Sequence, residues 1–231
     1  MNWQLISFFG DSTVLLPSAA ALFIVLMLRK TSRLLAWQWS LLFGITGAIV
    51  CASQLAFMGW GLGIRELDYT GFSGHSALSA AFWPIFLWLL SARFSAGLQK
   101  AAVATGYILA VVVGYSRLVI HAHSVSEVIA GLLLGAAGSA LFLLLQKRTT
   151  HPESVNISWG GVACLVMVPL ILLHSGSKAP TQSLLGQIAT AVGPLDKPFT
   201  RNDLHKQVWL SLIHISEPTR HFKRSRMPSS A

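Results

Sequence analysis

The charged residues of this chain divide it into six long uncharged segments. These segments are residues 12–28, 34–64, 69–92, 101–116, 128–146 and 154–177. Crossing the hydrocarbon core of a bilayer takes about 20 apolar residues, with a range of roughly 17 to 25. The shortest segment, 101–116, is flanked by Lys100 and Arg117, whose long side chains can reach the membrane interface. We therefore predict an all-α, polytopic membrane protein with six transmembrane helices in a bundle.

The composition favours this prediction over a soluble protein. Only 11% of the 231 residues are charged, whereas an average soluble domain has about 25%. No basic residue precedes the first segment and three follow it, so we expect a retained span and not a cleaved signal peptide. Cys51 and Cys164 lie in separate apolar segments, which predicts buried thiols and argues against a disulfide framework or a zinc site.

The positions of the basic residues indicate the membrane topology and do not indicate a nucleic-acid partner. The net charge is +9, and such an excess is typical of proteins that bind nucleic acid or an anionic membrane. Most bases of the predicted membrane region lie in alternate loops, namely Arg29, Lys30, Arg33, Arg93, Lys100, Lys147 and Arg148. By the positive-inside rule these loops are cytoplasmic, and the N-terminus and the second and fourth loops face outward. We expect membrane lipids around the protein and no nucleic-acid partner.

The two outward loops combine acids, bases and histidines. The second loop contains Arg65, Glu66, Asp68, Ser73 and His75, and the fourth contains Ser116, Arg117, His121, His123 and Glu127. Ionisable groups at the ends of membrane helices are costly unless they are solvated or paired, so their convergence indicates a functional site. The alternative is a pair of solvated loops. Asp11 and Tyr69 are expected near the same face, without an assigned role.

The spacing within these loops is typical of phosphoryl chemistry. Ser73 and Gly74 open an apolar helix, where serine caps the helix and backbone N–H groups can approach an anion. If the chain is helical from about His123, then His123 and Glu127 share one face, and the carboxylate accepts a hydrogen bond from Nδ1–H. That bond would leave Nε2 of His123 free to act as a nucleophile.

The stretches FSGH and SRLVIHAHSVSE resemble the second and third signature motifs of the type 2 phosphatidic acid phosphatase family. Those motifs read PSGH and SR-x5-H-x3-D in this family of integral-membrane lipid phosphatases. The resemblance covers residues 1–178 and implies a six-helix phosphatase domain with its active site at the outer membrane interface. It also implies a metal-independent enzyme without a cofactor.

The resemblance assigns a role to each matching residue. His123 would be the nucleophile that forms a phosphohistidine, Glu127 would orient it, and His75 would be the general acid for the leaving group. The phosphoryl oxygens would be held by Arg117, Ser73 and the backbone of Gly74. His121 lies two residues from His123 but has Val125 four residues on instead of a carboxylate, which favours His123.

Each of the three family motifs departs from the family pattern in this chain. Glu127 stands in place of Asp, and Phe72 in place of Pro. The first motif, K-x6-RP, aligns best with Arg65 at its Arg, which leaves Met58 at its Lys and Glu66 at its Pro. One phosphate-binding cation is therefore missing, and Arg65 is either a phosphate ligand or a partner of the neighbouring acids Glu66 and Asp68.

The C-terminal part of the chain differs in composition from the rest. Residues 179–209 contain prolines and scattered charges, which predicts a polar tail that is disordered or lies on the surface. Residues 210–231 include SLIHISEPTR and SRMPSSA, which resemble translated sequencing-adapter sequence. We therefore interpret 210–231 as a non-native extension.

Together these features predict a lipid phosphatase of a bacterial inner membrane, with its N-terminus and active site facing the periplasm or exterior. The expected substrate is a phosphomonoester or diphosphate of a lipid, such as undecaprenyl diphosphate, phosphatidylglycerophosphate or phosphatidic acid. One alternative is a catalytically silent membrane protein that binds or moves anionic lipid head groups. Another is a metal site formed by His75, His121 and His123.

Overall fold

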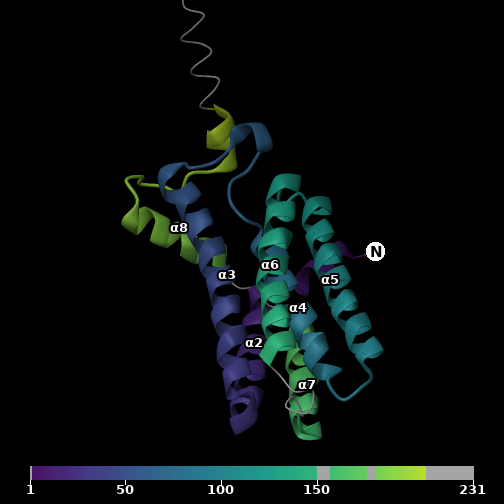
Figure 1. The fold of residues 1–231 in the computed structure, drawn as a ribbon. Helices are drawn as coiled ribbons and strands as arrows, with labels where there is room; N and C mark the ends of the chain where they lie inside the picture. Colours follow the sequence, from purple (N-terminus) through teal and green to yellow (C-terminus); the bar gives the residue numbers. More distant parts are fainter. Residues whose placement is uncertain (1, 150–156, 176–180, 207–231) are drawn as a thin grey trace, which may run out of the picture.

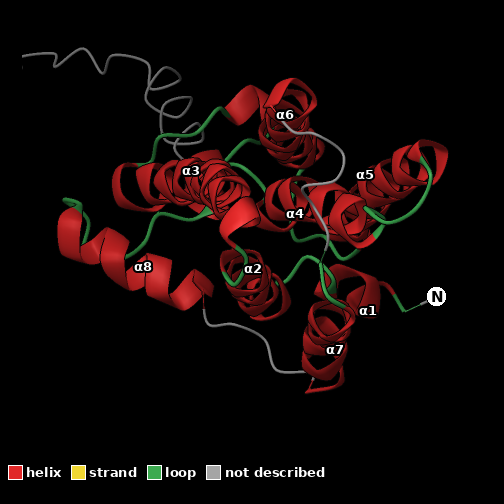
Figure 2. Ribbon diagram, turned by 60° about the horizontal axis from the view of Figure 1, so that its bottom comes forward, coloured by secondary structure: helices red, strands yellow, loops and turns green. Residues whose placement is uncertain are grey.

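The protein folds into a bundle of helices (Figures 1 and 2). The computed structural model describes residues 2–149, 157–175 and 181–206. The helices are α1 (Trp3–Phe8), α2 (Ser12–Met27), α3 (Arg33–Trp60), α4 (Gly74–Leu90), α5 (Ala96–Val119), α6 (Val125–Thr149), α7 (Trp159–Ser175) and α8 (Thr181–Val192), with 3-10 turns η1 (Lys30–Ser32) and η2 (Arg65–Leu67). The described residues contain no named strand, and Ile64 and Tyr69 form an isolated bridge. The predicted all-α class is confirmed.

Each of the six uncharged segments overlaps one of the helices α2 to α7, and α3, α5 and α6 extend beyond their segments. Four helical stretches in the described residues are long and apolar enough to cross a membrane, namely Trp3–Met27, Lys30–Trp60, Ala96–Val119 and Val125–Lys147. The helices α4 and α7 are also apolar but have 17 residues each. These helices indicate a membrane protein, and the count of six spans stays a prediction.

Helix α4 is the centre of the bundle. It packs against α2, α3, α5 and α6, and Figure 2 shows it among these four helices. Aromatic side chains fill this interior, with Phe82 and Phe86 stacked at 5.0 Å between ring centroids and Trp83 edge-on to Phe86 at 5.6 Å. Because α4 is enclosed, the residues at its first turn are held by neighbours on several sides.

The outside of the bundle is also apolar. Large hydrophobic side chains are exposed along the long helices, among them Leu41, Ile45, Ile108, Val111, Leu133 and Leu144. This is the surface that a hydrocarbon environment accepts and water does not. Cys51 and Cys164 are exposed as well, so the prediction of buried thiols is wrong. In such a bundle, a residue of an apolar segment can lie on the outer surface as well as in the core.

The connections alternate between the two ends of the bundle. The turns after α2 and α4 lie at one end, and the loops after α3 and α5 lie at the other (Figure 1). The second and fourth loops therefore meet at one end, opposite the basic first and third loops. Which end faces the cytoplasm stays a prediction.

The C-terminal segment of residues 181–206 is folded against the end of α3. Helix α8 packs on α3, residues 201–206 form a short helical turn, and Ala189 and Leu204 are buried. The sequence predicts that this region is disordered or lies on the surface. In the structure, residues 181–206 lie on the surface and pack at the end of the bundle where the second and fourth loops meet. Residues 207–231, which include the extension predicted for 210–231, lie outside the described residues.

Candidate active site

The two motif regions are joined directly at the start of α4 and α6. The backbone N–H of Ser73 donates to the carbonyl oxygen of Glu127 at 3.1 Å. A Cβ at Gly131 would lie 2.7 Å from the carbonyl oxygen of Ser73, so glycine permits this close approach of the two helices. Gln54 of α3 fixes the loop before α4, because its Nε2 donates to the carbonyl oxygen of Phe72 at 3.0 Å.

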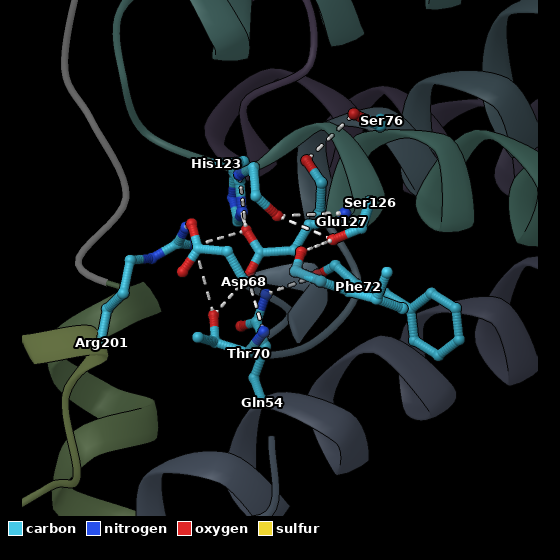
Figure 3. A network of polar contacts seen from close by, with 12 residues as sticks. Gln54, Asp68, Thr70, Phe72, Ser76, His123, Ser126, Glu127 and Arg201 are labelled. Atoms are coloured by element: carbon cyan, nitrogen blue, oxygen red, sulfur yellow. Dashed lines mark hydrogen bonds and ion pairs between the residues drawn. The ribbon is translucent and has the colours of Figure 1, made fainter. Parts of the chain in front are cut away.

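His123 and Glu127 form the pair expected from their spacing. Nδ1 of His123 lies 2.7 Å from Oε2 of Glu127, and Figure 3 shows the two side chains meeting in a network of polar contacts. A carboxylate can only accept here, so Nδ1 carries the proton and Nε2 holds the free lone pair. The predicted hydrogen bond is confirmed, whereas the catalytic roles of the two residues stay predictions.

The carboxylate of Glu127 is fully buried, at 0% exposure, and every lone pair has a donor within reach. Oε1 accepts from the backbone N–H of Thr70 at 2.7 Å and from the Thr70 hydroxyl. Oε2 accepts from the backbone N–H of Ser124 at 3.1 Å in addition to His123. These hydrogen bonds fix the carboxylate before any substrate arrives. Burial raises the pKa of the neighbouring Tyr69 hydroxyl, and the charge of Glu127 raises this pKa further.

Arg201 from the C-terminal segment also reaches Glu127. Its Nη2 donates to Oε2 of Glu127 at 2.7 Å, and its Nη1 pairs with Asp68. Asp68 is contacted in turn by Nε2 of His205 at 3.0 Å. Sequence reasoning missed Arg201 because it belongs to no motif. The pattern Thr200-x-x-Asp203, a helix-start signal, was the one local indication of order beside it.

His75 faces a different carboxylate. Its Nε2 lies 3.5 Å from Oδ2 of Asp11. Asp11 is the N-cap of α2, and its Oδ1 accepts from the backbone N–H of Thr13 at 2.9 Å. A Cβ at Gly10 would lie 2.5 Å from Val113 Cγ1, so glycine lets the junction of α1 and α2 approach α5 and the start of α4. Asp11 is thus a second acidic residue at the site, and the sequence analysis assigned no role to it.

Arg117 lies on the His75 side of the site. Its Nη1 donates to the hydroxyl of Ser7 at 2.7 Å, while its Nε is buried without a hydrogen-bond partner in the part of the chain that the structure describes. Arg117 and His123 thus lie within electrostatic reach of His75, and the buried Nε–H of the guanidinium has no partner among the described residues.

Ser73 stands at the N-cap position of α4, but its side chain makes no capping hydrogen bond. Its hydroxyl instead accepts from the hydroxyl of Ser76 at 3.0 Å, and both serines are fully buried. The expected capping bond is therefore wrong, because the neighbouring serine on the next turn competes for the oxygen. Gly74 begins the helix, where a first turn has N–H groups without intrahelical acceptors.

Arg65 and His121 lie apart from these contacts. Arg65 is exposed in η2, and its guanidinium makes no hydrogen bond or ion pair with another described residue. The pairing with Asp68 raised by the sequence is not formed, since Asp68 binds Arg201 and His205. His121 is exposed just after α5, with a positive φ of 54°, which marks it as a helix-ending residue.

A family model described as the PAP2 superfamily matches residues 65–151. The chain belongs to the PAP2 superfamily. The matched residues include both motifs, whereas Asp11 and Arg201 lie outside them. The chain is also 94% identical over 209 residues to a Klebsiella pneumoniae protein, "Uncharacterized 22.5 kDa protein in cps region", across 90% of this chain and 100% of that protein. No solved structure matches. Members of the PAP2 superfamily are phosphatases, which supports a phosphatase activity on phosphate esters.

No three His, Cys, Asp or Glu side chains are arranged to hold a metal within residues 2–149, 157–175 and 181–206. The alternative site formed by His75, His121 and His123 thus lacks the geometry that a metal requires. This PAP2 site instead contains two histidines, each facing a carboxylate, with Arg117 within electrostatic reach of His75.

A cavity of about 690 Å³ opens beside His123. It lies between the end of α3, the loop before α4 and the C-terminal segment, and its walls include Gln54, Phe57, Met58, Thr70, His123, Gln187, Phe199 and Arg201. The C-terminal segment therefore contributes to the space nearest the candidate nucleophile, a contribution that the motifs do not indicate.

Proposed function

We propose that this protein hydrolyses a phosphomonoester or a diphosphate of a lipid through a phosphohistidine intermediate. The observation that carries the proposal is the 2.7 Å contact between Nδ1 of His123 and the buried carboxylate of Glu127. This contact fixes one tautomer and leaves Nε2 as a nucleophile beside a cavity large enough for a head group and the first part of its chain.

In the first step, Nε2 of His123 attacks phosphorus and the bond from phosphorus to the leaving oxygen breaks. The electron pair of that bond stays on the leaving oxygen, which takes a proton from His75. In the second step, water gives a proton back to His75 and attacks the phosphohistidine, the P–N bond breaks with its electron pair returning to Nε2, and inorganic phosphate leaves. Positive charge and N–H groups near phosphorus stabilise the charge on its oxygens in both steps.

The groups proposed to bind the phosphoryl oxygens are Arg117, Ser73 and the first backbone N–H groups of α4, including that of Gly74. Arg117 has the strongest support, because its buried Nε lacks a partner among the described residues, and a buried unpaired donor is costly. Arg65, also expected from the sequence to bind phosphate, is exposed and does not line the cavity beside His123.

A lipid is the proposed substrate because the bundle is apolar on its outer surface. A substrate held in a bilayer would present its phosphate at the end of the bundle where the site lies. We place that end at the outer face of a bacterial inner membrane, since the basic loops after α2 and α4 lie at the opposite end.

The test compares the same substitution at two neighbouring histidines. His123→Asn is expected to lower phosphate release by at least about 10³-fold, as in enzymes that lose a nucleophile. His121→Asn is the matched control, because asparagine tolerates the positive φ at that exposed position. Release is measured with undecaprenyl diphosphate, phosphatidylglycerophosphate, phosphatidic acid and lipid A phosphates, with and without excess chelator.

Undiminished release by the His123→Asn protein would sink the proposal. Binding of these lipids by the unmutated protein without any release would favour the catalytically silent alternative. Activity that survives the chelator is the result expected of a metal-independent reaction.

A further inference from the structure

We propose that Arg201 is a positioning residue for His123 and Glu127, acting from a C-terminal segment that also lines the cavity beside His123. The inference rests on the function proposed above. It concerns a residue outside both motifs and outside the residues that the family model matches.

The first support is the charge balance around Glu127. This carboxylate is fully buried, and a buried charge without a partner is strongly destabilising. Nη2 of Arg201 and Nδ1 of His123 both lie 2.7 Å from the same oxygen, Oε2. Arg201 therefore compensates the charge of Glu127 and fixes the oxygen that orients the His123 ring (Figure 3).

The second support is that Arg201 is itself held in place. Thr200 and Asp203 exchange hydrogen bonds across the start of the short helical turn, with the Thr200 N–H donating to Asp203 at 3.0 Å. These bonds favour the ionised carboxylate and lower the pKa of Asp203. The N–H of Phe199 donates to the carbonyl oxygen of Met58 at 2.8 Å, which anchors the segment to α3.

The third support is the shape of the cavity. The cavity is lined by Gln187 of α8 and by Phe199 and Arg201 of the following segment, together with Met58 of α3 and His123. The ring of Phe199 packs edge-on against Phe57 at 5.5 Å between centroids. Without residues 181–206, the space beside His123 would lack this part of its lining.

The contacts favour positioning over direct binding of the substrate phosphate. The guanidinium of Arg201 is shared between the carboxylates of Glu127 and Asp68, so its charge is already compensated. Arg117 differs, because its Nε is buried and has no partner within the described residues. Loss of Arg201 should therefore lower kcat and leave KM nearly unchanged.

The kinetic test uses the full chain in lipid vesicles or nanodiscs. Arg201→Gln is expected to lower kcat about 10- to 100-fold through misplacement of His123, with KM changed less than about 3-fold. Arg201→Lys should recover part of kcat, because it keeps the charge and loses the planar fork. Lys197→Gln, which removes an exposed charge from the same segment, is the matched control and should resemble the unmutated protein.

A second measurement does not depend on turnover. In protein labelled with ¹⁵N-histidine, the His123 signals are identified by their loss in His123→Asn. They should show the Nδ1–H tautomer in the unmutated and Lys197→Gln proteins, and a changed tautomer balance in Arg201→Gln. Unchanged His123 signals would overturn the proposal, as would an effect confined to KM. Absence of phosphate release by the unmutated protein would instead count against the proposed function alone.

Discussion

The two histidines of the site have the same kind of partner in different geometries. His123 meets Glu127 four residues away at 2.7 Å through Nδ1, whereas His75 meets Asp11, which lies 64 positions earlier in the chain, at 3.5 Å through Nε2. The His123 side chain is 12% exposed and that of His75 is 23% exposed. One pair is short, local and enclosed, and the other is looser and joins distant elements.

The difference agrees with the two proposed tasks. A nucleophile must direct one lone pair at phosphorus, so a short hydrogen bond on the opposite ring nitrogen favours it. A general acid must deliver a proton to an oxygen that moves away, which tolerates a longer contact. The comparison can be tested by substitutions that affect one half of the site and leave the other intact.

The largest effect in this comparison is expected for His75→Gln. Release of phosphate from a lipid phosphate should fall about 10²- to 10³-fold, because an alkoxide leaves poorly without a proton. The rate of the pre-steady-state burst with p-nitrophenyl phosphate should fall by no more than about 10-fold, since nitrophenolate leaves without a proton. Rapid-mixing measurements of both substrates provide the ratio.

The control for this prediction is His123→Asn, which should abolish the burst with the aryl substrate as well. If His75→Gln lowered the burst and the lipid reaction equally, His75 would not be the acid. The proposed division of labour between the histidines would then fail.

The sequence predicts the local pair of the site and misses two of its long-range pairs. The spacing of His123 and Glu127 predicts their contact because one helical turn separates them. Asp11 pairs with His75 and Arg201 with Glu127 across separations of 64 and 74 residues. Such pairings depend on how helices pack, and no periodicity in a single sequence records them.

The fold shows the same limit. Uncharged segments locate the helices because charges are rare where hydrocarbon surrounds a chain. The ends of some helices differ from the ends of the uncharged segments, because other features of the sequence decide where a helix ends. Helix α5 runs from Ala96 to Val119 and passes both Lys100 and Arg117, because charged ends do not stop a helix. Helix α3 stops at Gly61, whose φ of 69° is a left-handed helix end, although the uncharged segment continues to residue 64.

An intermediate effect is expected for Glu127→Asp, which converts the residue to the one in the family pattern. The carboxylate of Glu127 is held by Thr70 and Arg201 at its present depth. Removing one methylene withdraws it from His123, from these donors or from both. We expect kcat for the lipid substrate to fall about 10-fold, with the aryl burst falling equally because the nucleophile acts on both substrates.

Glu66→Asp, the same change at an exposed position in η2, serves as the control. Full activity of Glu127→Asp would show that the surrounding donors follow the carboxylate. The local pair would then be less rigid than its 2.7 Å contact implies.

The smallest effect is expected for Asp11→Asn. Asparagine keeps an oxygen that can accept from Thr13, so α2 should keep its N-cap, while the charge facing His75 is lost. Across the 3.5 Å contact, this should lower lipid turnover about 3- to 10-fold by making His75 a poorer proton carrier. The aryl burst should not change, because it depends on the His123 half. An equal loss with both substrates would mean that Asp11 supports the whole site, since Arg117 lies within its electrostatic reach, and the two halves would then act as one unit.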